Sequence, residues 1–167
     1  MDVLEGLQQI RGEMDRYVVG HDDVKEAVML GLIAQEHIYL EGPPGTAKTM
    51  LAEITSEAAD LKFFFYQLHR DTRLAELVGD TVIFRERDTS GGELIRQMNR
   101  KGGILTAEIC VLDDISRAPG EALNILLRIL NERKFGPGKI VIRVHLHIFV
   151  LRIFRGTGVK IFRRLAF

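Results

Sequence analysis

The sequence predicts an α/β domain in which a parallel β-sheet lies between two layers of helices. Three apolar runs have the length of buried strands, namely His37–Leu40, Phe63–Leu68 and Ile109–Leu112. Segments with helical periodicity alternate with these runs, and a glycine-rich loop joins the first run to the helix after it. Because uniformly apolar strands that alternate with helices are typical of parallel sheets covered on both faces, we expect three layers.

The expected helices have apolar residues spaced three or four positions apart. They cover residues 2–16, 22–34, 48–59 and 120–133. Asp22 or Asp23 is expected to cap the second helix, since a carboxylate can accept hydrogen bonds from free amides there. The polar segment 85–103 contains Thr89-Ser90-Gly91-Gly92, a sequence typical of a hairpin turn, and the chain is strand-like from Ile140 onward.

Composition indicates a cytoplasmic protein with no nucleic-acid partner. The net charge is zero, a single cysteine excludes an internal disulfide, and the N-terminus lacks the pattern of a secretory signal. No stretch reaches the ~18 consecutive apolar residues of a membrane span. The 23 acidic residues all precede residue 141, whereas the last 27 residues carry six basic ones. We therefore divide the chain into an N-terminal helix (1–16), a core (17–140) and a basic, apolar tail (141–167).

The strongest motif is GPPGTAKT, from Gly42 to Thr49. A strand, a tight turn and a helix start bring backbone N–H groups and the helix dipole together on phosphate groups. Lys48 is expected to reach the β- and γ-phosphates, and the Thr49 hydroxyl to bind Mg²⁺. Ala47 stands where this pattern has glycine; in a right-handed helical conformation its methyl would only tighten the fit. The alternative is an ordinary Gly/Pro turn before a helix.

Two carboxylates, Asp113 and Asp114, follow the third apolar run. Ligands of parallel sheets collect beyond the carboxyl ends of the strands, so these acids are expected near the phosphate loop. We expect Asp113 to hold Mg²⁺ and Asp114 to orient or deprotonate the attacking water. The alternative is that two exposed acids end a strand and cap the next helix.

Several segments together resemble the MoxR family of AAA+ ATPases. They are VVGHDD, LEGPPGTAKT, ELVGD, LDDISRAP and the leucine-rich helix that ends in NERKFGPG, within residues 15–140. The resemblance implies a P-loop NTPase core of three αβα layers. It also implies that Val18–Gly20 lies near the adenine, that residues 80–103 form an insertion, and that residues 132–144 form a hairpin. Proteins of this family act as ATP-driven chaperones, usually as rings, on a client protein.

Two features depart from the family. Such proteins usually carry Glu where Asp114 stands, and the Asp carboxylate reaches about 1.5 Å less far. A misplacement of that size can lower the rate about 100-fold. The second departure is the tail, in which we find no sensor Asn, arginine finger or helical lid domain. We interpret this as a truncated or alternatively read C-terminus.

Other residues leave alternatives open. His145 and His147 would face the same way on a strand and could bind a metal, or could simply belong to the strand face. Cys110 is expected to be a buried core residue. Arg117 either contacts nucleotide across a subunit interface or is a solvated helix-start residue. The basic tail could be a membrane-surface or nucleic-acid patch, or a segment with no selected role.

The leading hypothesis is an ATPase that converts ATP and water to ADP and phosphate and thereby remodels a partner protein. Lys48 and Asp114 are its expected catalytic residues, and Thr49 and Asp113 its expected Mg²⁺ ligands. The expected ATP-binding residues are Val19, Gly20, Gly42, Pro43, Pro44, Gly45, Thr46, Ala47, Lys48, Thr49 and Met50. One alternative is a hydrolysis-deficient nucleotide-binding module that regulates a full-length ring ATPase. Another is a small-molecule kinase, for which we find no acceptor site.

Overall fold

The structure of this chain is a computed structural model. Its backbone is described for residues 2–43, 45–87, 93–136, 142–143, 147–153 and 158–162. Its side chains are described for residues 2–43, 45–80 and 100–136.

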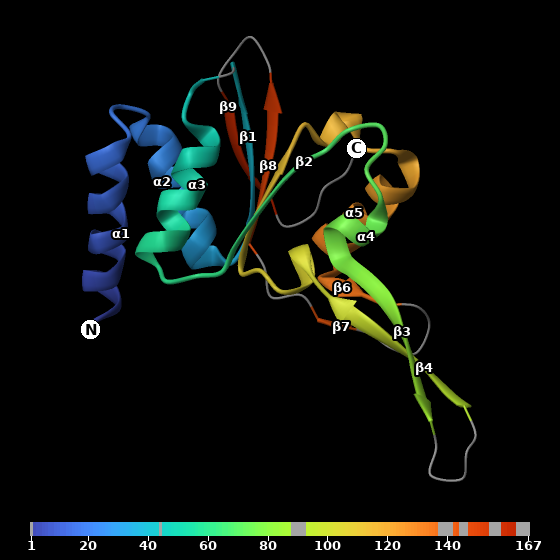
Figure 1. The fold of residues 1–167 in the computed structure, drawn as a ribbon. Helices are drawn as coiled ribbons and strands as arrows, with labels where there is room; N and C mark the ends of the chain where they lie inside the picture. The colour runs from blue at the N-terminus through green and yellow to red at the C-terminus, as the bar shows by residue number, and fades with distance from the viewer. Residues whose placement is uncertain are drawn as a thin grey trace.

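A five-stranded sheet forms the centre of the fold (Figure 1). Its strands, in spatial order, are β2 (Phe63–Gln67), β5 (Ile109–Asp113), β8 (His147–Ile153), β1 (His37–Gly42) and β9 (Gly158–Phe162). The first four are parallel, whereas β9 pairs antiparallel with β1. The predicted parallel α/β core is confirmed, and the edge strand β9 makes the sheet mixed.

Helices cover both faces of this sheet (Figure 1). Those on one side are α1 (Val3–Tyr17), α2 (Asp22–Ala34) and α3 (Lys48–Ala58). Those on the other side are α4 (Leu74–Val78) and α5 (Gly120–Glu132). Short 3₁₀ turns, η1 (Gly103–Leu105) and η2 (Ile115–Arg117), lie before and after β5. No helix in the described part of the chain is long and apolar enough to cross a membrane.

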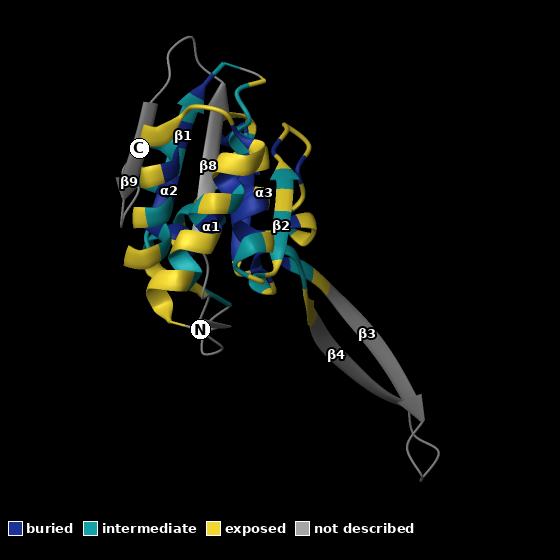
Figure 2. Ribbon diagram, turned by 90° about the vertical axis from the view of Figure 1, so that its left-hand side faces the viewer, coloured by how far each residue is buried: buried dark blue, intermediate teal, exposed yellow. Residues whose placement is uncertain are grey.

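Strand β5 separates two hydrophobic cores because successive side chains of a strand point to opposite faces. Ile109 and Val111 pack with the buried residues of α1, α2 and α3. Cys110 and Leu112 pack with those of α4 and α5. Figure 2 shows the buried residues concentrated where α3 meets the sheet. The expected core position of Cys110 is confirmed, and burial raises the pKa of its thiol well above the ordinary range.

The start of α2 differs from the expectation that Asp22 or Asp23 caps it. His21 occupies the cap position in a left-handed conformation (φ 58°), and its side chain makes no capping hydrogen bond. Asp22 and Asp23 lie in the first helical turn instead. There their carboxylates still interact favourably with the positive end of the helix dipole.

A hairpin formed by β3 (Gly79–Arg87) and β4 (Glu93–Lys101) projects from the domain (Figure 1). The hairpin expected from the polar segment is therefore confirmed, although the turn at residues 89–92 lies outside the described residues. A second, short hairpin pairs β6 (Lys134–Phe135) with β7 (Ile142–Arg143), inside the range 132–144 that the resemblance implied.

The division of the chain at residues 16 and 140 stays a prediction. The sheet continues beyond residue 140, because β8 pairs with both β1 and β5, and β9 pairs with β1. The tail thus contains a central strand of the sheet and one of its edge strands.

We predict that Gly103→Ala destabilises the fold at the base of the projecting hairpin by about 2–4 kcal/mol, from overpacking and left-handed strain together. Gly103 has φ +50°, and an added Cβ would lie 2.3 Å from the carbonyl oxygen of Leu77. Neither backbone segment has room to move without disturbing the core around Leu77, which is fully buried.

The measurement is the midpoint of urea unfolding. The control is Gly12→Ala, at an exposed position of α1 where an added Cβ meets no atom within 4 Å. Removing a helix-interior glycine there should stabilise the protein by up to about 1 kcal/mol. Equal midpoints for the two variants would contradict the prediction.

Candidate nucleotide-binding site

The site lies at the edge of the sheet where the parallel strands end. Strand β1 ends at Gly42, and the chain turns there into α3, which begins at Lys48. In the strand register, Leu151 of β8 is opposite both Leu40 of β1 and Asp113 of β5. Because neighbouring strands lie about 4.8 Å apart, β1 and β5 run about 10 Å apart at this edge. The fold therefore brings the two sequence motifs together.

The loop contains two residues in the left-handed conformation, Gly45 (φ 80°) and Ala47 (φ 54°). Alternation of left- and right-handed residues is the backbone pattern that, in anion-binding loops, points successive N–H groups to the same side. The expectation that Ala47 is right-handed is wrong. Its Cβ therefore carries the strain that a glycine at this position would avoid.

The first turn of α3 leaves its amides available. Ala47 precedes the helix without a capping side chain, and no acidic residue lies in the first turn. The first hydrogen bond of the helix runs from the amide of Leu51 to the carbonyl of Ala47, at 2.9 Å. The amides of Lys48, Thr49 and Met50 thus have no acceptor within the helix, and the positive end of the helix dipole adds to their attraction for an anion.

The ammonium group of Lys48 is hydrogen-bonded to three oxygens of the loop that precedes it. Its Nζ donates to the carbonyl oxygens of Gly42 (3.0 Å) and Pro43 (2.6 Å), and to the Oγ1 of Thr46 (3.1 Å). The Thr46 hydroxyl donates to the same Pro43 carbonyl at 2.9 Å. Partial burial lowers the pKa of Lys48, and the negative charge of Asp113 opposes that shift. A bound phosphate would compete with these three oxygens for the ammonium group.

Asp113 and Asp114 have different surroundings. Asp113 is half-buried, and its Oδ1 accepts a hydrogen bond from the amide of Asp114 at 2.9 Å. Burial raises the pKa of Asp113, and the neighbouring charge of Asp114 raises it further, while Lys48 and Arg117 oppose the shift. Asp114 is 5% exposed, so the alternative of two exposed acids does not describe it.

The carboxylate of Asp114 faces Arg117. Its Oδ2 is buried and accepts no hydrogen bond from a described residue, but it lies 3.4 Å from the Nε of Arg117. Asp114 is itself left-handed (φ 52°), at the sharp turn from β5 into η2. The side chain of Arg117 is 62% exposed, which is compatible with both roles considered for it, and its role stays a prediction. Its contact with Asp114 was not expected from the sequence.

The loop and Asp113 suit a metal ion most of whose ligands are phosphate and water oxygens. The described residues contain no group of three or more His, Cys, Asp or Glu side chains that could hold a metal. The Thr49 hydroxyl makes no hydrogen bond with a described residue, so it is free to coordinate. Two protein oxygens together with phosphate and water oxygens match the preferences of Mg²⁺. Of the two histidines considered as ligands, His145 lies outside the described residues, and only the backbone of His147 is described.

Of the remaining expected residues, Val19 and Gly20 lie in the connector between α1 and α2, and Met50 lies in the first turn of α3. Val19 is 92% exposed, Gly20 is left-handed (φ 75°), and Met50 is 42% exposed on α3. Pro44 lies outside the described residues. Val18 is buried in the same core cluster as Leu51 of α3. The connector between α1 and α2 therefore shares a hydrophobic core with α3.

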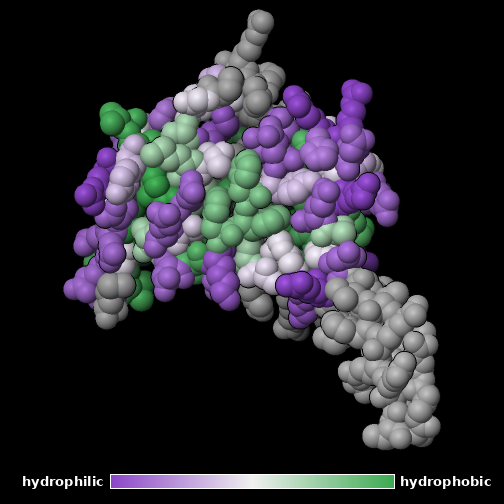
Figure 3. All heavy atoms as spheres, viewed as in Figure 1, coloured by the Kyte–Doolittle hydropathy of each residue, from purple (hydrophilic) through white to green (hydrophobic). Residues whose placement is uncertain are grey.

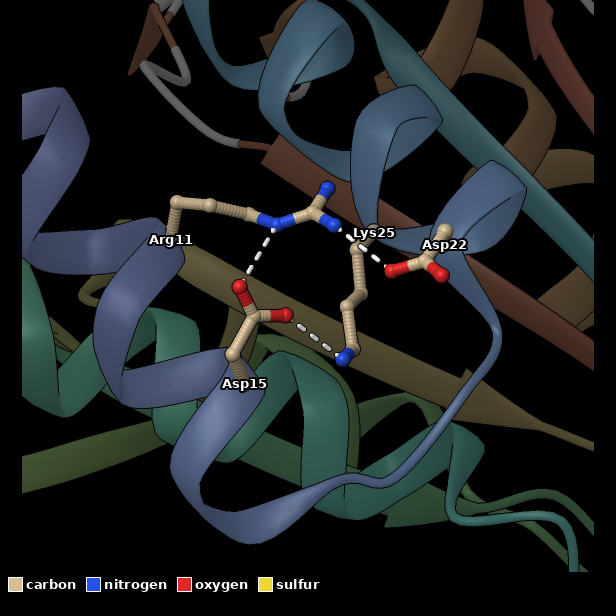
Figure 4. Close-up of polar contacts among 4 residues, drawn as sticks. All are labelled: Arg11, Asp15, Asp22 and Lys25. Atoms are coloured by element: carbon tan, nitrogen blue, oxygen red, sulfur yellow. Dashed lines mark hydrogen bonds and ion pairs between the residues drawn. The ribbon is translucent and has the colours of Figure 1, made fainter.

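Sequence reasoning missed a charge network between α1 and α2 (Figure 4). It consists of Arg11, Asp15, Asp22 and Lys25. The available signal was the position of Lys25, three residues before Val28 on the apolar face of α2. A charged residue at a core position requires a partner of opposite charge.

Comparison with known proteins identifies the family. The model for the MoxR domain of MoxR-vWA-beta-propeller ternary systems matches residues 5–152. This chain belongs to the MoxR family of AAA+ ATPases. Chaperone MoxR1 of Mycobacterium tuberculosis is 29% identical over 132 residues, which are 79% of this chain and 33% of that protein. An uncharacterized protein of Methanocaldococcus jannaschii is 30% identical over 146 residues, which are 87% of this chain and 37% of that protein.

A solved structure supports the fold. The crystal structure of a Cytophaga hutchinsonii protein, described as a candidate ATPase, has a TM-score of 0.67 and 22% identity to this chain. The match covers 90% of this chain and 43% of that protein. The predicted family and AAA+ fold class are confirmed, and the chain spans about a third of the length of the MoxR relatives above.

We predict that Ala47→Gly stabilises the domain by up to about 1 kcal/mol, because it relieves about 1–2 kcal/mol of left-handed strain and forfeits part of a methyl group's burial. Ala47 is partly buried against the core, so the two effects oppose each other. Thermal unfolding of the two proteins measures the difference. A variant less stable than the wild type would contradict the left-handed conformation of Ala47.

Proposed function

We propose that this domain binds Mg-ATP at the loop from Gly42 to Thr49 and hydrolyses it to ADP and phosphate, driving the remodelling of a partner protein. The observation that carries the proposal is the uncapped start of α3, whose first amides have no acceptor within the helix, together with the Lys48 ammonium that is bound to the loop before it. Membership of an ATPase family supports the same conclusion.

In this mechanism, the amides of the loop and Lys48 bind the phosphate chain and stabilise the charge that develops on the leaving ADP. Thr49 and Asp113 would hold Mg²⁺, which supplies further neutralisation of phosphate charge. Asp114 orients a water molecule for in-line attack on the γ-phosphorus and accepts its proton as the bond to ADP breaks. Val19 and Gly20 would contact the adenine, and Met50 would lie beside the phosphates.

A second candidate function is nucleotide binding without turnover, as a module within a ring of full-length relatives. The observation in its favour is the ion pair between Asp114 and Arg117, which holds a short carboxylate in a buried position. Released from Arg117, Asp114 could activate water. If Asp114 stays paired with Arg117, the subunit would bind nucleotide without hydrolysing it.

The partners that we propose follow from the family. The matching family model describes ternary systems of MoxR, vWA and β-propeller proteins, and one relative is a chaperone. We propose assembly into a homo-oligomeric ring, in the cytoplasm, acting on a client protein with a vWA domain. Figure 3 shows hydrophobic residues gathered near the centre of one face, within a mostly hydrophilic surface. Phe65, on the edge strand β2, is 42% exposed and available for protein contact.

We predict that Lys48→Ala weakens Mg-ATP binding about 10- to 100-fold, because a charge-assisted contact to phosphate contributes about 1.5–3 kcal/mol. Hydrolysis should fall to background. Titration with a fluorescent ATP analogue and a phosphate-release assay measure the two effects. The control is Lys62→Ala, an exposed lysine at the opposite, amino-terminal end of β2. Unchanged affinity in Lys48→Ala would refute the phosphate site.

We predict that Asp114→Glu raises the rate of ATP hydrolysis by up to about 100-fold, because it restores about 1.5 Å of reach toward the water. Asp114→Asn, which keeps the size of the side chain and removes its basicity, should abolish hydrolysis with little change in ATP affinity. The measurement is kcat from phosphate release at saturating Mg-ATP. If wild type and Asp114→Asn are equally inactive while both bind ATP, the domain is the passive module.

A further inference from the structure

We infer that the charge network of Arg11, Asp15, Asp22 and Lys25 positions the connector between α1 and α2 for the adenosine part of the nucleotide. Lys25 and Asp15 are then positioning residues, which act on the ligand through residues 18–21. This inference rests on the proposed ATP site and assigns a role to a buried charge that the hydrolysis mechanism does not use.

The network consists of three contacts, two of which tie α1 to α2 (Figure 4). The Nζ of Lys25 donates to the Oδ1 of Asp15 at 2.7 Å. The Nε of Arg11 donates to the other oxygen of Asp15 at 3.2 Å, and its Nη2 donates to the Oδ1 of Asp22 at 2.7 Å. Each helix thus contributes one cation and one carboxylate, and two of the three contacts cross between the helices.

Lys25 makes this network specific to one arrangement of the helices. Its side chain is 2% exposed, whereas that of its partner Asp15 is 49% exposed. A buried ammonium group costs several kcal/mol unless it is paired with good geometry, so other arrangements of α1 and α2 are disfavoured. The hydrogen bonds from Lys25 and then Arg11 hold the pKa of Asp15 below its usual range, so the carboxylate stays charged at neutral pH.

The connector between the two helices is held at both of its ends by backbone hydrogen bonds. The amide of Val18 donates to the carbonyl oxygen of Met14 at 2.9 Å. The amide of Lys25 donates to the carbonyl oxygen of His21 at 3.0 Å. Between these bonds, Gly20 and His21 are both left-handed (φ 75° and 58°). A chain held at both ends in this way presents Val19, which is 92% exposed, in a fixed direction.

The connector and the phosphate loop share one core cluster but have separate supports. Val18 is 4% exposed and packs in the cluster that contains Leu51 and, at its margin, Ala47. The phosphate loop is held by Lys48 and Thr46, whose hydrogen bonds end on the loop itself. Loosening the charge network should therefore affect recognition of adenosine and leave recognition of phosphate nearly intact. A network that merely stabilised the helices would affect both or neither.

The decisive variant is Lys25→Met, which keeps the length of the buried chain and removes its charge. Asp15 keeps Arg11 as a partner and lines an open cavity of about 420 Å³ between α1 and α2, so its charge is not stranded. The dissociation constants of Mg-ATP and of inorganic tripolyphosphate with Mg²⁺ are measured by calorimetry. We expect the value for ATP to rise about tenfold and that for tripolyphosphate to stay within about twofold.

The control is Arg16→Met, which removes a 69% exposed cation of α1 whose ion pair, to Glu13, lies within the same helix. It should change neither affinity. Equal weakening of both ligands, or no weakening of either, in folded Lys25→Met would overturn the inference. If Lys25→Met does not fold, Arg11→Gln is compared in the same way, with about a threefold loss expected for ATP alone and the same outcomes overturning the inference.

The affinities of the wild-type protein for ATP and tripolyphosphate distinguish failure of this inference from failure of the proposed function. If neither ligand binds, the proposed nucleotide site is wrong. If tripolyphosphate binds as tightly as ATP, the phosphate site stands, adenosine contributes nothing, and the connector has no positioning role.

Discussion

The parallel pairing of β1, β8 and β5 is the constraint on which the rest of this structure depends. Parallel strands end at the same edge of a sheet, so Lys48 and Asp113 face one site although 64 residues separate them in sequence. The two apolar faces of β5 then require helices on both sides, and the helix that follows β1 points its amino end toward this edge. The site is a consequence of how the sheet is ordered.

At this edge the charges are arranged before any ligand binds. Burial lowers the pKa of Lys48 and raises that of Asp113, and the attraction between the two groups opposes both shifts. Burial thus destabilises the charged form of each side chain, and the opposite charge of the other side chain stabilises it. In the proposed function, phosphate and a divalent cation would supply both groups with closer partners of opposite charge.

The two positions where this chain departs from common patterns have different physical consequences. Ala47 adopts a left-handed conformation, which is strained in a residue that has a Cβ. Asp114 is shorter than the usual glutamate, and its carboxylate is turned to Arg117. The first departure concerns stability and the second concerns turnover. In the function that we propose, nucleotide binding and hydrolysis therefore depend on different residues.

The sequence by itself determined the family, the fold class and most of the elements around the candidate site. The apolar runs, the helical periodicities and the GPPGTAKT motif predicted β1, β2, β5 and the helices α1, α2, α3 and α5 to within a few residues, because these features depend on local patterns. The short helix α4 was not predicted. Local pattern also identified Cys110 as a core residue. It did not give the conformation of Ala47 or the cap of α2, where the required backbone geometry overrides residue preference.

Only the tertiary structure decided which distant residues meet. The insertion of β8 between β1 and β5, the contact of Arg117 with Asp114, and the burial of Lys25 against Asp15 all follow from packing between elements. A one-dimensional pattern records which residues are apolar or charged and how they are spaced. It does not record which strands become neighbours in the sheet, or which helix supplies the partner of a buried charge. Both depend on how all the elements pack together.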